Sequence, residues 1–280
     1  MPDSLVYQSC HITQALHNEI ASVVVDEDAE DLGLAKATPI DSNSEAVKVF
    51  HSKLNKIVTA MKGAYPNIDP TPEVVLTVKS GAKACEGMLP NFRYAVMDSV
   101  EDEKVKGYKA NRAGLPVLDG LVELFDYIAT LDYVVLLPEI EADDYCVRMG
   151  LEGHIVAALD KDVVYSVPRA YNYGKEEWVS TTSNERRKWF FTQCITGDSS
   201  DGLRGVFRVG AKGAEKALKN LESMTDYEAW VVVIKQYLMK DQTVEEAIAT
   251  ARCVSMVQWT IEDGLVLWEP PTKENEWMKW

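Results

Sequence analysis

The chain of 280 residues is long enough for one large or two modest domains, and its 46% hydrophobic and 26% charged residues are typical of a folded globular protein. Its 44 acidic and 29 basic residues give a net charge of −15, which argues against nucleic-acid binding unless acids and bases gather at separate sites. The sequence has no apolar run long enough for a membrane span, no secretory signal pattern and no Cys-x-x-Cys pair among its five cysteines. We therefore expect a cytoplasmic protein with no membrane contact, no disulfide framework and no cysteine zinc site.

The first expected helix follows an acidic segment. Residues 26–46 have no apolar period, which predicts an exposed loop. Ser42 with Glu45 three residues later matches a capping box, and apolar residues at helical spacing continue to about Gly63. The sequence thus predicts a helix that ends before the break at Pro66.

Three short β-branched runs predict buried strands, at residues 74–78, 133–137 and 154–159. Helical patterns over 118–128 and 142–149 separate them. This alternation predicts an α/β fold with a central, mostly parallel sheet flanked by helices. Ligands of such sheets bind beyond the carboxyl ends of the strands, so residues that follow neighbouring strands would face one crevice.

The second half of the chain is mostly helical in pattern. Apolar periodicity runs from about residue 185, and Thr243 with Glu246 forms a second possible capping box. The basic run 186–188 is interpreted as a solvated helix face. We predict two domains, an α/β domain over 1–180 and a helical region over 181–280.

Carboxylates follow two predicted strands and one later helix. Each group alone is also typical of a helix cap or a turn, but acids at successive strand ends are unfavourable unless cations neutralise them. With only four histidines in the chain, oxygen ligands favour Mg²⁺, with Mn²⁺ as a substitute, and two such ions would suit phosphoryl displacement. The candidate metal ligands are Glu141, Asp143, Asp144, Asp160, Asp162, Asp198 and Asp201.

Two basic segments are candidates for nucleic-acid contacts. After the last acids, glycines flank a short apolar hairpin and open a helix that carries lysines, a pattern suited to phosphate binding, although a plain loop between surface helices would look similar. The candidate DNA-binding residues are Arg204, Gly205, Arg208, Gly210, Lys212 and Lys216. The second segment, residues 104–112, places Tyr108 among bases that include Lys109 and Arg112.

These motifs, taken in order as GYKANR, EADD, LDKD and GDSSDGLRGVFRVGAKGAEKAL, resemble the flap endonuclease and 5′→3′ exonuclease family, most closely its phage-encoded members. The likeness runs from about residue 74 to 220. It implies a PIN-like nuclease fold in which the seven acids form the metal site. It also implies a helix-hairpin-helix over 202–218 that holds duplex backbone with the help of K⁺. Lys109 and Arg112 would lie in or beside the helical arch through which the 5′ strand passes.

The chain departs from the family pattern at two places. The family's first strand carries an Asp ligand in D-x-D-S-L-x-Y, and here Asp3 matches the second acid while Met1 stands at the ligand position. The run 74–78 is followed by Lys79, where the family usually has an acid. We therefore expect metal binding, with the activity depending on whether these two acids are dispensable.

The leading hypothesis is a Mg²⁺-dependent nuclease that removes nucleotides from 5′ ends of duplex or flapped DNA in phage replication, in the cytoplasm of the host. Glu141, Asp143, Asp160 and Asp162 would hold the metals, and Lys109 and Arg112 would steady the scissile phosphate. RNA primers and RNA–DNA hybrids stay open as substrates. Two rivals stay open as well: a DNA-junction binding protein without chemistry, and a single-strand RNA nuclease of the PIN type, which leaves the hairpin glycines unexplained.

Overall fold

The computed structural model describes residues 40–67, 71–77, 79, 81–100, 107–110, 120–260 and 263–274. The chain divides into two compact units, one formed by residues 1–89 and 115–142 and the other by residues 90–114 and 143–280. The division near residue 180 stays a prediction.

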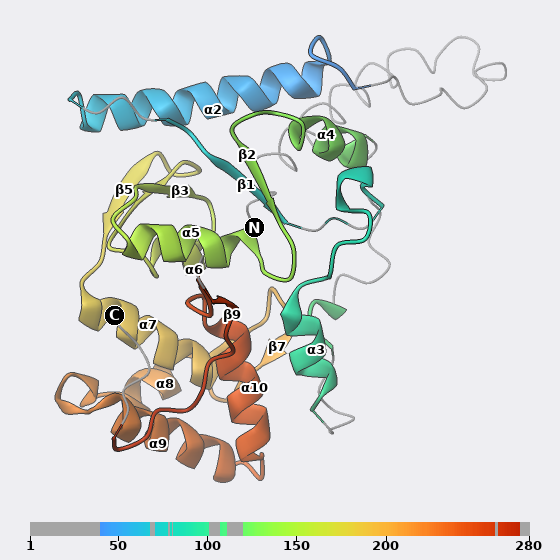
Figure 1. The fold of residues 1–280 in the computed structure, drawn as a ribbon. Helices are drawn as coiled ribbons and strands as arrows, with labels where there is room; N and C mark the ends of the chain where they lie inside the picture. Colours follow the sequence, from blue (N-terminus) through green and yellow to red (C-terminus); the bar gives the residue numbers. More distant parts are fainter. Residues whose placement is uncertain are drawn as a thin grey trace, which may run out of the picture. The chain divides into compact units, whose positions relative to one another are not determined.

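The first unit packs helices against a pair of parallel strands (Figure 1). Its elements are α2 (Glu45–Ala64), β1 (Val74–Thr77), the 3-10 helix η1 (Lys83–Cys85), α4 (Leu121–Ile128) and β2 (Val134–Leu137). Val74 pairs with Val134 in the parallel register of β1 and β2. The core joins Phe50 of α2, Leu76 of β1 and Leu124 of α4, all fully buried. The predicted strands 74–78 and 133–137 and the helix before the second strand are thus confirmed.

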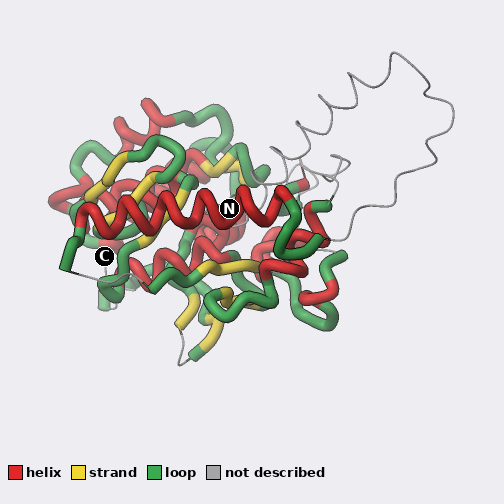
Figure 2. The backbone as a smooth tube through the Cα atoms, turned by 90° about the horizontal axis from the view of Figure 1, so that it is seen from above, coloured by secondary structure: helices red, strands yellow, loops and turns green. Residues whose placement is uncertain are grey.

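The helix α2 begins later than its predicted cap. Its first residue is Glu45 and its N-cap is Ser44, whose side chain makes no capping bond to the helix and instead accepts the Asp41 N–H at 2.8 Å. The capping box between Ser42 and Glu45 is therefore wrong, because Ser42 lies before the N-cap position. The predicted helix itself is confirmed, and Figure 2 shows it from above as one continuous helix.

The second unit combines a three-stranded sheet with a helical bundle (Figure 1). Its first elements are α3 (Phe92–Asp98), α5 (Ala142–Leu151, which begins at the last residue of the first unit), β3 (Val156–Ala158), α6 (Lys161–Val164), β4 (Arg169–Asn172) and β5 (Glu177–Ser180). The later ones are α7 (Ser183–Thr196), β6 (Gly197–Asp198), β7 (Leu203–Arg204), α8 (Ala211–Ala217), η3 (Leu221–Ser223), α9 (Asp226–Leu238), α10 (Val244–Val254), β8 (Trp259–Thr260) and β9 (Gly264–Leu265).

The sheets of the described residues confirm the α/β class and its parallel pairing. The strand β3 runs parallel to β4, and β5 pairs antiparallel with β4. The strands β2 and β3 belong to different sheets, so the condition under which the acids after them would share one crevice is not met by direct pairing of these strands. The reason is the hairpin β4–β5, which no sequence pattern predicted and which supplies the partner of β3.

Helices α7, α9 and α10 pack against one another, and each begins at a capping box. In each box a threonine side chain accepts the N–H of a glutamate three residues on, and that glutamate accepts the threonine N–H. The predicted box at Thr243 and Glu246 is confirmed. In the part of the chain that the structure describes, none of the helices is both long enough and apolar enough to span a membrane.

Candidate active site

Strand β3 leads directly into a group of contacting carboxyl groups. Asp160 is the N-cap of α6, and its side chain accepts the Asp162 N–H at 2.8 Å. The carboxyl group of Asp162 is buried, hydrogen-bonds that of Asp198 in β6, and accepts the Gln193 Nε2 amide at 2.9 Å. The predicted acids of β3 and of the 198–201 turn therefore meet within the second unit.

Burial and mutual repulsion perturb these acids. Burial is the main cause that raises the pKa of Asp162 to about 8, and the hydrogen bond with Asp198 and the charges of Asp160 and Asp198 add to it. Burial acts in the same sense on Asp198, but its hydrogen bonds from Ser200 and Asp162 and the charge of Lys161 lower its pKa overall. A carboxyl group whose pKa is raised because its charge is unfavourable is suited to a hard divalent cation, since the cation would neutralise that charge as a proton does.

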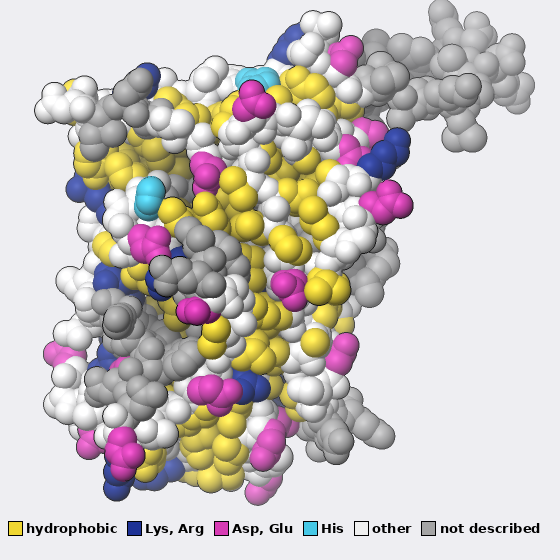
Figure 3. Space-filling view, viewed as in Figure 1, with side chains coloured by type: hydrophobic (Ala, Val, Ile, Leu, Met, Phe, Trp, Pro, Cys, Tyr) yellow, Lys and Arg dark blue, Asp and Glu magenta, His cyan; other side chains and the backbone are white. Residues whose placement is uncertain are grey.

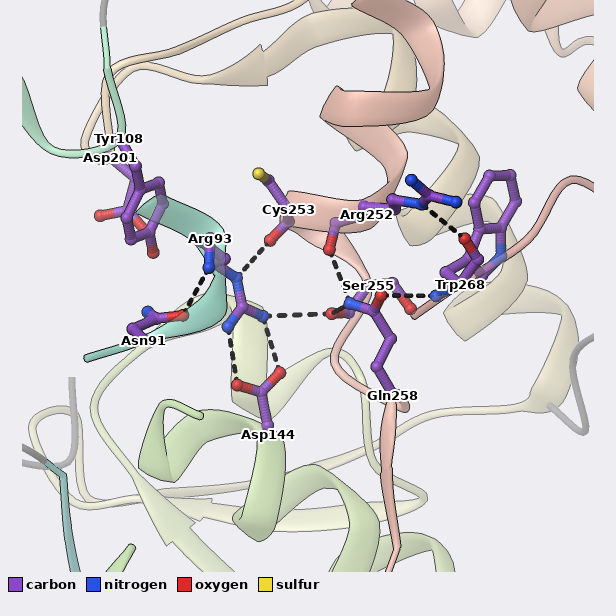
Figure 4. Close-up of polar contacts among 10 residues, drawn as sticks. All are labelled: Asn91, Arg93, Tyr108, Asp144, Asp201, Arg252, Cys253, Ser255, Gln258 and Trp268. Atoms are coloured by element: carbon purple, nitrogen blue, oxygen red, sulfur yellow. Dashed lines mark hydrogen bonds and ion pairs between the residues drawn. The ribbon is translucent and has the colours of Figure 1, made fainter. Parts of the chain in front are cut away.

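Asp144 is engaged by a cation of the chain itself. Figure 4 shows Arg93 of α3 pointing between Asp144 and the main chain at the end of α10. Arg93 Nη1 and Nη2 each donate to one oxygen of Asp144 at 2.7 Å, Nε donates to the Cys253 carbonyl at 2.7 Å, and Nη2 also donates to the Ser255 carbonyl at 3.1 Å. The two side chains are 2% and 1% exposed. Asp144 as a metal ligand stays a prediction, and the structure assigns its carboxylate to an ion pair.

Asp201 holds the segment that carries Lys109. The Tyr108 hydroxyl donates to Asp201 Oδ2 at 2.8 Å, the Lys109 Nζ lies 3.8 Å from Asp201 Oδ1, and the Lys109 N–H donates to the Asp201 carbonyl at 2.8 Å. Lys109 adopts a positive φ of 54°, and its ammonium lies over the Tyr108 ring. These contacts place Lys109 against the acidic turn 198–202, whereas Arg112 lies outside the described residues.

The remaining predicted ligands are less fully engaged. Asp143 is buried in the first turn of α5, and Glu141 is half-buried in the first unit. Among the residues that the structure describes, no three His, Cys, Asp or Glu side chains are close enough to hold one metal ion together. The seven-acid metal site therefore stays a prediction. Met1 and Asp3 lie outside the described residues, and the Lys79 side chain is half-buried.

The hairpin between α7 and α8 carries the predicted DNA-binding residues. Gly205 packs so closely that a Cβ there would lie 2.3 Å from backbone atoms of both Gly197 and Ile195. Arg208 is exposed at a positive φ of 58°, and Gly210 is the exposed N-cap of α8. Lys212 and Lys216 are on α8. Helix, two-stranded hairpin and helix follow in the expected order, while the contacts of these residues with DNA stay a prediction.

The contacts of three residues at this site carried no sequence signal, although Tyr108 itself lies in a segment predicted to bind nucleic acid. Arg93 reaches Asp144 over 51 positions, Gln193 reaches Asp162 over 31, and Tyr108 reaches Asp201 over 93. Spacing rules find partners within a helical turn or along a strand and say nothing of such pairs.

The sequence matches no protein-family model and no curated protein. Solved structures do match. One is the flap endonuclease of bacteriophage T5 as a pseudo-enzyme–product complex with DNA and metal ions; it is 16% identical, covers 74% of this chain and 81% of its own, and has a TM-score of 0.52. Another is the T5 5′-exonuclease with bound zinc ions, at 15% identity, the same coverage of both chains and a TM-score of 0.49.

The fold defined by these elements is that of the phage-type flap endonucleases with their PIN-like α/β architecture. The T5 flap endonuclease is one protein that this chain is similar to in structure. On the face drawn in Figure 3, acidic and basic side chains are interspersed.

Proposed function

We propose that this chain is a Mg²⁺-dependent 5′→3′ exonuclease and flap endonuclease that hydrolyses phosphodiester bonds at 5′ ends of duplex or flapped DNA during phage replication. The observation that carries the proposal is the contact between Asp162 and Asp198 beside Asp160, in a fold shared with a phage flap endonuclease. A buried carboxyl group in contact with a second carboxylate favours a cation, and phosphodiester hydrolysis is the chemistry that such a cation serves.

The residues that would hold the metal are the predicted acids of the second unit, and Glu141, which belongs to the first unit, stays a predicted ligand. Asp160, Asp162 and Asp198 are the strongest candidates, because each supplies a carboxylate that interacts with at least one other acid. When bound, divalent cations supply the positive charge that stabilises the attacking and leaving oxygens. Asp162 and Asp198 fit such a cation in their oxygen chemistry and in the raised pKa of Asp162, and the third ligand that a metal ion needs is not among the described residues that meet there.

The chain itself supplies a positioned cation for the substrate. Lys109 is fixed by its N–H bond to Asp201, by the ion pair with the same residue and by the Tyr108 ring. An ammonium held next to the acidic turn is suited to bind the scissile phosphate and to orient it. Arg112, three residues further along, is proposed for the same task.

The hairpin 197–210 and helix α8 are proposed to bind the duplex backbone, with K⁺ as an additional ion at the hairpin. Arg204 and Arg208, together with Lys212 and Lys216, supply the charge. Such contacts fix register on DNA without reading sequence.

The test is cleavage of a 5′-labelled flapped duplex over a series of Mg²⁺ and Mn²⁺ concentrations. The wild-type chain is expected to release short 5′ products, and the combined change Asp160→Asn and Asp162→Asn is expected to abolish them while DNA binding persists. Retained cleavage in that variant would refute the assignment of the acids. An RNA–DNA hybrid in the same assay decides whether primers are substrates.

One observation favours a second candidate, a DNA-junction binding protein of the same fold without cleavage. Asp144 and Asp201 already interact with Arg93 and Lys109, so two of the seven acids have cationic partners in the chain. Tight, salt-sensitive binding of flapped DNA without cleavage at any metal concentration would favour this candidate.

A further inference from the structure

The loop between β7 and α8 forms a tip that presents an aromatic ring between two arginines. Phe207 is 43% exposed, which makes it one of the most exposed large hydrophobic side chains among the described residues. The guanidinium carbon of Arg204 lies 4.8 Å from the ring centroid and that of Arg208 lies 4.9 Å from it. Cation–π attraction therefore holds two positive charges against one apolar ring.

The backbone holds this tip in a fixed form. The Phe207 N–H donates to Gln242 Oε1 at 2.7 Å, and Gln242 Nε2 donates to the Gly205 carbonyl at 3.3 Å, so one side chain joins both residues of the tip to the start of α10. The side chain of Val206, between them, is buried, and its N–H donates to the Ile195 carbonyl at 2.7 Å. An apolar ring kept in solvent by a rigid backbone is arranged for an external contact and not for the core.

The two arginines lack carboxylate partners. Within the described part of the chain, neither Arg204 nor Arg208 forms an ion pair with an acid, in contrast to Arg93, Arg187 and Arg252. The tip therefore carries two uncompensated positive charges in a protein of net charge −15. The two guanidiniums match a binding partner with two anions, and the ring matches a flat apolar surface between them. A nucleic-acid strand offers both, as successive phosphates and the base between them.

We propose that Phe207, Arg204 and Arg208 form a binding site for an unpaired segment of nucleic acid, in which a base displaces one guanidinium from the ring and stacks on that face, while both guanidiniums contact the adjacent phosphates. The site deepens the proposed function and rests on it, because it assigns to the hairpin a single-stranded contact in addition to duplex backbone. A base within a duplex has both faces stacked, so the ring reaches a base only where the strand is unpaired. The occupant would be the flap strand or a frayed end of the substrate.

The test measures binding in the absence of divalent metal, by fluorescence anisotropy, so that it does not depend on cleavage. One probe is a duplex with a single-stranded 5′ flap, and the second is the same molecule with abasic flap nucleotides, which keep the phosphates and lose the bases. Phe207→Ala is expected to weaken binding of the first probe roughly 5- to 150-fold, the range of base–aromatic stacking. It should leave the abasic probe unaffected, and Phe207→Trp should restore binding.

The salt dependence separates the ring from the charges. Arg204→Gln and Arg208→Gln are each expected to reduce the slope of log K against log salt by about 0.7, the value for one phosphate of a single strand. Phe207→Ala should lower the affinity without changing the slope. Leu238→Ala, a control at a 53% exposed residue of α9, should change neither quantity.

If Phe207→Ala weakens the binding of both probes equally, the stacking contact is refuted. It is also refuted if Phe207→Ala leaves the binding of the first probe unchanged. If the wild-type chain binds the flap in this way and yet cleaves nothing with Mg²⁺, the proposed nuclease fails and the binding site stands. If the wild-type chain cleaves the flap and Phe207→Ala has no effect on binding, the nuclease stands and the binding site fails.

Discussion

The ion pair between Arg93 and Asp144 allows a direct test of whether Asp144 is structural. Asp144→Asn keeps the size of the side chain and removes its charge. Arg93 would then remain 2% exposed with its positive charge unbalanced, bonded only to an amide oxygen and to the carbonyls of Cys253 and Ser255. A buried charge without its counterion is among the most unfavourable changes that a substitution causes.

The expected loss follows from the burial of both partners. Removing one partner of a buried pair costs about 3–5 kcal/mol. In a unit of this size, 1 kcal/mol corresponds to about 2–4 °C in the unfolding midpoint, so Asp144→Asn should lower that midpoint by about 6–20 °C. The pair also joins α3 to α5 and to the end of α10, which adds cooperativity to the loss.

The assay is urea and thermal unfolding in EDTA, so that no metal contributes. The double change Arg93→Met and Asp144→Leu removes both charges and should be less destabilising than Asp144→Asn alone. Arg148 and Glu152, a half-exposed pair that begins on the same helix, supply the control: Arg148→Met should cost less than about 1 kcal/mol.

Wild-type stability of Asp144→Asn in EDTA would refute the structural role. If Asp144→Asn were as stable as the wild-type protein in EDTA but less stable than it in the presence of metal, Asp144 would be a metal ligand and its ion pair with Arg93 would contribute nothing to stability. The same comparison therefore separates the two roles of one carboxylate.

Three further predictions use the same preparations. First, because the pKa of Asp162 is raised to about 8, the folded state keeps a proton that the unfolded state loses above about pH 4, so the metal-free protein should lose stability between about pH 4 and 8. Asp162→Asn should remove this loss. A difference in unfolding midpoint between the wild-type protein and Asp162→Asn that stays constant with pH would contradict the prediction. Second, Tyr108→Phe removes the hydrogen bond to Asp201, so it should lower the free energy of unfolding by about 1.5–3 kcal/mol and should slow single-turnover cleavage. If the free energy of unfolding and the cleavage rate both stay unchanged, the hydroxyl group does not position Asp201 or Lys109. Third, Gly205→Ala should destabilise the protein by about 1–3 kcal/mol, because the Cβ of the alanine would lie 2.3 Å from backbone atoms. Gly210→Ala places its Cβ in open space and should leave the stability unchanged. Equal unfolding midpoints for the two variants would count against the hairpin geometry.

The sequence predicted the elements whose signals are local. The β-branched run at 74–78 became β1, and the threonine–glutamate spacing at Thr243 became the capping box of α10, because both depend on residues within one turn or one strand. At the start of α2 the same rule misplaced the cap by two residues, because Ser42 and Ser44 both lie near Glu45 and only the backbone path chooses between them.

The charges were harder to predict, because their partners are distant in the chain. The run 186–188 has the composition of a solvated face, yet Arg187 is buried and donates to Asp226, with two more bonds to the carbonyls of Leu221 and Met224. A basic residue therefore belongs to the core when carbonyls and a carboxylate converge on it from another helix. No pattern within α7 carries that information.

The predicted metal ligands likewise differ in whether a basic side chain of the protein pairs with them. The charges of Asp160 and Asp198 both act on Asp162, and Lys161, whose charge opposes them, lies on the helix that Asp160 caps. Asp144 and Asp201 are paired with Arg93 and Lys109. The acids of the first kind are destabilising unless a cation or a proton joins them, whereas those of the second kind already serve the fold and the position of Lys109. A chain that had lost its chemistry would gain nothing from holding the buried Asp162 against the half-buried Asp198, and this is why the carboxyl contact between them favours the nuclease over the binding protein.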